Sequence, residues 1–197
     1  PFLGEFEVKA PEGRIGYLNY ELNEGQCLQW FEDMSISHQS RVSVMNLRGK
    51  PGCLWVEDNL ARFTEWLHQR DISTLVIDPA GRAWRGVVED ENSNSQVREF
   101  TSILDEVKDQ GGVTDLVLVH HIGKSHRDEG TERGRGASAL EDWPDAIWVL
   151  TKDENGTRSF GAEGRDVELE PHDLDYDHPT RALTISGTRA VRRAQDK

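Results

Sequence analysis

Acidic and histidine side chains follow three mostly apolar stretches of the sequence. Glu21, Asp78 and the neighbours His120 and His121 each come directly after such a run. A carboxylate at the end of a buried strand is costly to desolvate unless a cation or a hydrogen-bond donor lies beside it. Mg²⁺ keeps several waters and takes one or two carboxylates, so Asp78 could hold this ion directly or through water. Glu21 could orient or deprotonate an attacking water, and a histidine could donate to a phosphoryl group in transfer.

Each of these residues, taken alone, is better explained as a polar strand end that faces solvent. Their order along the chain favours a shared site, because ligands of open parallel sheets bind outside the carboxyl ends of the strands. We therefore expect Glu21, Asp78 and His121 to converge on one crevice. The chemistry of these groups suits a metal-bound phosphate ester.

Apolar strands alternate with amphipathic helices through residue 152, which predicts an α/β fold with a parallel sheet covered on both faces. The clearest helical stripe lies between the third and fourth strands and ends at Gly111 and Gly112. The stripe consists of Val97, Phe100, Ile103, Leu104 and Val107. The expected parallel strands cover residues 14–20, 41–47, 73–78, 114–121 and 145–152.

The pattern changes after Lys152. The letters ENGT indicate a hairpin turn, and the segments TRSFGAEGRDVELE and TRALTISG are typical of antiparallel strands. No repeat or linker divides the chain. We therefore expect one domain over residues 1–197, with residues 153–197 as an antiparallel β extension at the sheet edge.

The composition excludes several classes of protein. Charged residues make up 30% of the chain and the net charge is −13, which disfavours broad electrostatic binding to DNA or anionic lipid. Any contact with nucleic acid must therefore be local. Two cysteines are too few for a disulfide framework and predict a cytoplasmic protein, and no stretch has the apolar length of a membrane span.

Four segments together resemble the AAA-family ATPases with a RecA-type core. They read GYLNYEL, LVIDPAGRAWRGVVEDENSNSQV, LVLVHHIGK and ERGRGASALEDWPDAIWVL. The resembling group includes RepA-like hexameric replicative helicases of plasmids and the helicase modules of phage and mobile-element primase proteins. The likeness covers most of the chain, because the C-terminal segments also resemble the terminal hairpin of that family.

The resemblance implies a RecA-like fold, ATP and Mg²⁺ as cofactors, a homo-oligomeric ring, and a function on single-stranded DNA. It assigns Asp78 as the Walker B acid that holds the metal and Glu21 as the catalytic glutamate. His121 becomes the sensor of the γ-phosphate, with His120 as the alternative. Arg135 lies where the family places an arginine finger that reaches the nucleotide of the neighbouring subunit.

Lys124 and Arg133 are further candidate contacts to the nucleotide, in a glycine-rich loop over residues 123–134. In ring helicases the corresponding loop faces a channel that grips single-stranded DNA by its backbone. A plain solvated loop explains these residues equally well, because acidic residues interleave with the basic ones. The Gly123, Lys124 and Ser125 triplet is not a phosphate-binding loop, since Leu118 stands where the first glycine of that motif should be.

The family's phosphate-binding motif, G-x-x-x-x-G-K-[ST], does not occur in the sequence. Residues 1–13 resemble the segment that follows this loop, so we expect a chain that begins just after it and binds ATP weakly by itself. Two functions remain open. The first is an ATP-driven ring motor on single-stranded DNA, and the second is a scaffold or binding module that keeps the fold without turnover.

Overall fold

The computed structural model describes residues 1–121 and 138–188. Their contacts divide them into two compact units. The first, which we call the parallel-sheet unit, contains residues 11–29 and the described part of 36–143. The second, the antiparallel-sheet unit, contains residues 1–10, 30–35 and the described residues from 144 onward.

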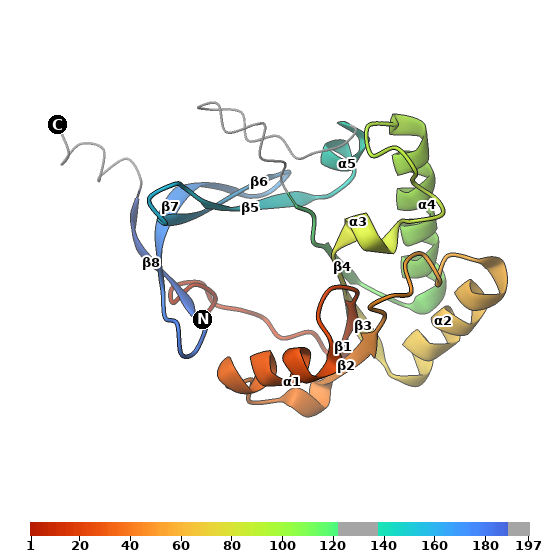
Figure 1. Ribbon diagram of the computed structural model, residues 1–197, viewed down its shortest axis with the longest axis horizontal. Coiled ribbons are helices and arrows are strands. Elements are labelled where there is room, and N and C mark those ends of the chain that lie inside the picture. The colour runs from red at the N-terminus through yellow and green to blue at the C-terminus, as the bar shows by residue number, and fades with distance from the viewer. Residues whose placement is uncertain (122–137, 189–197) are drawn as a thin grey trace. The chain divides into compact units, whose positions relative to one another are not determined.

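Four parallel strands form the sheet of the first unit, in the order β2-β1-β3-β4 (Figure 1). They are β1 (Arg14–Asn19), β2 (Val42–Asn46), β3 (Ile72–Asp78) and β4 (Asp115–Leu118). The last residue of β1, Asn19, pairs with the last residue of both neighbours, Asn46 and Asp78. Because the strands are parallel and end in register, the residues that follow them emerge at one edge of the sheet.

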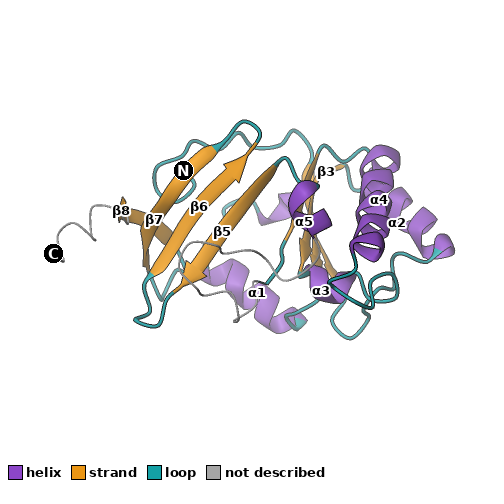
Figure 2. Cartoon of the chain, turned by 90° about the horizontal axis from the view of Figure 1, so that it is seen from above, coloured by secondary structure: helices purple, strands orange, loops and turns teal. Residues whose placement is uncertain are grey.

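Helices α2 (Glu57–Gln69) and α4 (Asn94–Gly111) lie side by side over one face of this sheet (Figures 1 and 2). Gly16 in β1 leaves room for two side chains of β3, because a Cβ at this position would lie 3.0 Å from Ile72 Cγ2 and 3.2 Å from Leu75 Cδ1. The shorter helices of the chain are α1 (Glu24–Asp33), the 3₁₀ turn η1 (Gln39–Arg41), α3 (Ala80–Ala83) and α5 (Ser138–Asp142). None of the described helices is long and apolar enough to cross a membrane.

The apolar stripe of α4 forms the centre of the core, as the sequence predicts. Val97, Phe100, Leu104 and Val107 are fully buried, and Ile103 packs against them. Helix α4 ends where expected, because Gly112 adopts the left-handed conformation with φ of 67°. Phe100 receives the edges of two tryptophan rings, Trp55 and Trp84, at centroid distances of 5.5 and 6.0 Å. Two loops, the one before α2 and the one after α3, therefore pack against α4 through their tryptophans.

The second unit contains an antiparallel sheet in the order β5-β6-β7-β8 (Figure 2). Its strands are β5 (Ala146–Lys152), β6 (Arg158–Gly164), β7 (Glu168–Tyr176) and β8 (Leu183–Thr188). Leu3, Phe160, Ala162 and Leu174 are buried in its small core. The antiparallel strands that the sequence predicts after residue 152 are confirmed, but they form a sheet of their own with β5 rather than an addition to the edge of the parallel sheet.

The expectation that residues 145–152 form a fifth parallel strand is wrong. These residues form β5, which pairs antiparallel with β6, so that Trp148 lies opposite Ala162. The turn after Lys152 explains this pairing: Asp153 N donates to Thr157 O at 2.9 Å, and Gly156 takes a φ of 88°. A tight turn of this kind returns the chain beside the strand it has just left.

A parallel strand covered on both faces would be buried along its length, and this segment is not. Ile147 and Val149 are half-buried and alternate with exposed neighbours, among them Trp148 and Leu150. Such alternation is typical of an antiparallel strand with one exposed face. In the parallel sheet, by contrast, Ile77 is fully buried, while Val76, Leu116, Leu118 and Val119 are half-buried.

Candidate active site

Glu21, Asp78 and His121 all lie at the carboxyl edge of the parallel sheet. Glu21 follows β1 by two residues, Asp78 ends β3, and His121 follows β4 by three. His121 Nε2 lies 3.6 Å from Glu21 Oε2, with the two side chains 70% and 46% exposed. An ion pair this exposed adds little to stability. The pair matters for the site because it brings an imidazole and a carboxylate together at the carboxyl edge of the sheet.

Asn19 determines how the chain leaves β1 toward Glu21. Its side chain is fully buried, and its Oδ1 accepts hydrogen bonds from the backbone N–H groups of Glu21 and Leu22 at 3.3 and 2.8 Å. Its Nδ2 donates to Leu22 O and to Asn46 Oδ1, both at 2.9 Å. This amide therefore pins the turn that carries Glu21 and ties it to the end of β2.

The carboxylate of Asp78 is half-buried and hydrogen-bonded by a tyrosine. Tyr17 Oη donates to Asp78 Oδ2 at 2.7 Å, while no described residue donates to the second oxygen, Oδ1. Burial, the hydrogen bond to Asp78 and the negative charge of that carboxylate together raise the pKa of Tyr17 above its usual value. The phenol is therefore protonated, as a donor to Asp78 must be.

Cys27 completes the surroundings of this carboxylate from α1. The thiol is 2% exposed, and burial, followed by the charges of Asp78 and Glu24, raises its pKa. A buried cysteine with a raised pKa is mostly thiol at neutral pH and makes a poor nucleophile. Asp78 thus has a tyrosine donor and acts on the Cys27 thiol through its charge, and no described cation pairs with it.

Backbone hydrogen bonds hold the strand ends together beyond the sheet itself. Tyr20 N donates to Asp78 O at 2.8 Å, and Ala80 N donates to Val119 O at 2.8 Å. The segment before His120 is therefore fixed against the start of α3. The His120 ring lies 5.3 Å from the Trp84 ring, between centroids. Of the two histidines, His121 is thus the one paired with Glu21, and His120 lies against an aromatic ring.

Three predicted site residues, Lys124, Arg133 and Arg135, lie outside the described residues. Tyr17, Asn19 and Cys27 belong to the site but are not predicted from the sequence, because strand ends alone do not point to them. The sequence does contain a pattern that could have pointed to Tyr17 and Asn19. Tyr17 and Asn19 lie two positions apart in β1, so they share one face of the sheet, and polar side chains at this spacing in a buried strand indicate a common task.

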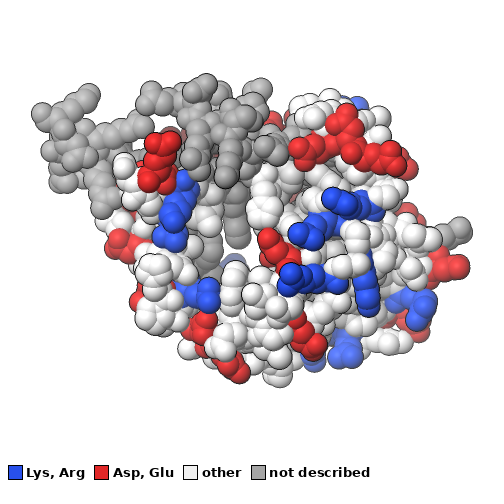
Figure 3. Space-filling view, viewed as in Figure 1, with Lys and Arg blue, Asp and Glu red and all other residues white. Residues whose placement is uncertain are grey.

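A basic patch lies beside this edge, where lysine and arginine side chains gather over α3 and the loop after β2 (Figure 3). We define it by Arg48, Lys50, Arg82 and Arg85, all exposed and without an ion-pair partner among the described residues. The two segments touch, since a Cβ on Gly52 would lie 1.6 Å from the carbonyl oxygen of Arg85. Such a cluster of cations is unusual on a chain of net charge −13.

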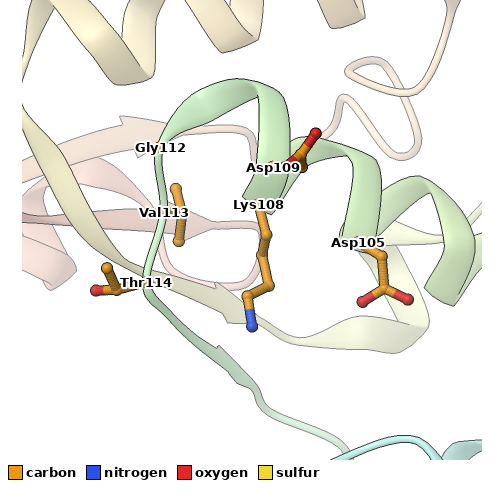
Figure 4. Close-up of a pocket in the computed structure, with 6 residues that line it drawn as sticks. All are labelled: Asp105, Lys108, Asp109, Gly112, Val113 and Thr114. Atoms are coloured by element: carbon orange, nitrogen blue, oxygen red, sulfur yellow. The ribbon is translucent and has the colours of Figure 1, made fainter.

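An open cavity of about 450 Å³ lies at the other edge of the sheet (Figure 4). The end of α4 and the turn into β4 line it, so it belongs to the amino ends of the strands. Its lining residues are Asp105, Lys108, Asp109, Gly112, Val113 and Thr114. None of the residues that meet at the carboxyl edge contributes to it.

Comparisons with known proteins agree with this geometry. A family model described as an AAA domain matches residues 1–127, which is more than half of the chain. The crystal structure of a KaiC-like protein from the hyperthermophilic archaeon Pyrococcus horikoshii is similar, with a TM-score of 0.56 and 11% sequence identity. The likeness covers 88% of this chain and 76% of that one. No curated protein sequence matches.

At 11% identity the structural likeness shows the fold alone, which is a RecA-type, KaiC-like core with a parallel sheet. The family follows from the sequence match over the segment that contains Glu21, Asp78 and His121. By that match, the chain belongs to the AAA domain family of nucleoside triphosphatases.

Proposed function

We propose that the chain is the catalytic core of an ATPase that works as a ring on single-stranded DNA, in the replication of a plasmid, phage or mobile element. One observation carries the hydrolytic part of this proposal. Glu21, Asp78 and His121 come from three strands to the same edge of the sheet in an AAA domain. The three residue types are those that phosphoryl transfer needs: a group to position water, a metal ligand and a donor to the phosphate.

The surroundings of Asp78 fit a hydrated Mg²⁺. One carboxylate oxygen is held by Tyr17, and the other has no described donor, so it can bind the ion or one of its waters. No three His, Cys, Asp or Glu side chains among the described residues gather as a metal site. An ion that arrives with the nucleotide needs only one or two protein carboxylates. A bound Mg²⁺ would neutralise charge on the β- and γ-phosphates.

The other residues have tasks of their own in this proposal. Glu21 accepts a proton from the attacking water or orients it, and Asn19 keeps the Glu21 turn in place. His121 Nε2 lies 3.6 Å from Glu21 Oε2, so a bound phosphate could take the place of Glu21 as the partner of His121. Donation from His121 to the γ-phosphate would then report the state of the nucleotide.

A phosphate-binding loop must complete the site. The second side of β4 has no partner strand among the described residues, and its Val117 is 37% exposed. An open edge in a parallel sheet supports pairing with one more strand, which would bring such a loop beside Asp78 and His121. The second candidate function is a scaffold that keeps the fold without hydrolysing ATP.

The ring and its DNA are proposed from the resemblance and from the distribution of charge. Arg135, which the resemblance makes an arginine finger, would act on the nucleotide of the neighbouring protomer in a hexamer. The basic patch supports a local contact with a nucleic-acid backbone, which the acidic remainder of the chain disfavours elsewhere. Lys124 and Arg133 would add to that contact or to the nucleotide site.

The metal dependence of ATP hydrolysis by the natural full-length protein tests the hydrolytic proposal. Asp78→Asn should raise the Mg²⁺ concentration needed for half-maximal phosphate release by about 10-fold or more, because an amide binds this hard ion less well than a carboxylate. Asp115→Asn is the matched control, since Asp115 begins β4 at the opposite edge, and should leave the Mg²⁺ dependence unchanged. Equal Mg²⁺ dependence in both variants would remove Asp78 from the metal site, and a wild-type protein without turnover would favour the scaffold.

A further inference from the structure

We infer that Tyr17 is a positioning residue for the metal-binding carboxylate, and that it holds Asp78 so that one oxygen stays available for Mg²⁺. The inference rests on the proposed function, because Asp78 binds a metal only if the site takes a metal-bound nucleotide. The observation that carries it is the 2.7 Å hydrogen bond from Tyr17 Oη to Asp78 Oδ2.

The register of the sheet explains why a tyrosine makes this hydrogen bond. Tyr17 pairs with Val76, and Asp78 lies two residues further along β3, opposite Asn19. Residues two apart in a strand share one face of the sheet, so Tyr17 and Asp78 face the same side. The phenol ring is long enough to bridge the diagonal between the two strands, which spans roughly 7–8 Å between side-chain positions. A serine or threonine hydroxyl at position 17 would be too short.

The hydrogen bond from Tyr17 fixes the rotation of the Asp78 carboxylate, which would otherwise be free to turn. The last torsion of an aspartate is broad and roughly two-fold, so a free carboxylate presents either oxygen. The Tyr17 hydroxyl occupies Oδ2 and leaves Oδ1 without a described donor. Groups that hydrogen-bond a metal ligand in this way orient it, and their removal typically weakens metal binding by about 10–100-fold.

The chain provides its own matched control three residues away. Tyr20 is 1% exposed, and its hydroxyl is buried without a hydrogen-bond partner among the described residues. Replacing either tyrosine by phenylalanine removes one hydroxyl and keeps the ring. Only Tyr17→Phe removes a donor to Asp78, so the two substitutions separate the effect on the carboxylate from the general effect of losing a hydroxyl.

The test measures binding of Mn²⁺ as a probe by electron paramagnetic resonance, in the presence of ADP, to the natural full-length protein. We expect Tyr17→Phe to weaken Mn²⁺ binding by about 10-fold and Tyr20→Phe to leave it unchanged, with the metal-free affinity for ADP equal in all three proteins. In an Asp78→Asn background, adding Tyr17→Phe should change nothing further, because its effect passes through the carboxylate. If Tyr17 only stabilised the fold, Tyr17→Phe would weaken Mn²⁺ binding further even in the Asp78→Asn background.

The outcomes separate this inference from the proposed function. Tyr17→Phe with wild-type or tighter Mn²⁺ binding would overturn the role of Tyr17 and leave the metal site standing. An equal loss in Tyr17→Phe and Tyr20→Phe would also overturn it, as a general effect of the missing hydroxyl. A wild-type protein that binds no Mn²⁺ with ADP would refute the proposed function and this inference together.

Discussion

Asn19 shows how one buried amide can support a site without contacting a substrate. It satisfies two backbone N–H groups and one carbonyl of the turn that carries Glu21, and it also binds Asn46. The same side chain therefore contributes to stability and to the position of the Glu21 carboxylate, which we propose to be catalytic. At the residue scale, Tyr17 and Asn19 share one face of the sheet in β1, and Glu21 follows in the turn after it.

Asn19→Ala should lower the free energy of unfolding by about 2–3 kcal/mol, because it leaves several buried polar groups unpaired at once. Chemical denaturation measures this change. Asn59→Ala provides the control, since Asn59 is exposed and its side chain donates to Cys53 O at 2.8 Å, and this change should cost at most about 1 kcal/mol. Similar costs for both variants would contradict the assigned role of Asn19.

The sequence was a good guide to some residues of the site and a poor guide to others. The order of the strands predicted that Glu21, Asp78 and His121 lie at one edge of the sheet, because the carboxyl ends of parallel strands share an edge. Tyr17 could not be predicted, because its role depends on a diagonal interaction between β1 and β3 that requires the register of the sheet. Cys27 is buried beside Asp78 through the packing of α1, which no local pattern indicates.

At the scale of elements, long periodic segments were predictable and a short apolar segment was not. The stripe of α4 specifies a helix, because five apolar residues at this spacing fit no strand, and the helix is found with its predicted end. The run in β5 is aliphatic enough for a parallel or an antiparallel strand. Its pairing is decided by the turn at Asp153 to Gly156, a local signal that outweighs the pattern of the strand itself.

The basic patch is a property of two elements, α3 and the loop after β2, and yields a prediction at this scale. If it binds single-stranded DNA, the double variant Arg82→Gln, Arg85→Gln should lower the slope of log affinity against log salt by about 1.4, because each neutralised phosphate contributes about 0.7 on a single strand. The control replaces Arg70 and Lys108 by Gln, because both lie near the amino ends of the strands. An unchanged slope in the patch variant, measured by fluorescence anisotropy, would exclude the patch as a DNA-binding surface.

For the molecule as a whole, the central claim is that an AAA domain with a RecA-type fold brings a water-positioning carboxylate and a metal-binding carboxylate to one edge of its sheet. Its overall acidity would restrict the proposed DNA binding to local basic surfaces. Nucleotide binding and nucleotide hydrolysis should therefore be separable by substitution, since the proposal assigns Glu21 to water and Asp78 to the metal.

The rate of phosphate release from saturating Mg²⁺·ATP, compared between the natural full-length protein and its Glu21→Gln variant, tests this claim most directly. Loss of a general base removes about 10²–10⁴-fold of rate without removing interactions with the phosphates. The account predicts that Glu21→Gln binds ATP with nearly wild-type affinity and turns over at least about 100-fold more slowly. Turnover at the wild-type rate by Glu21→Gln would contradict it.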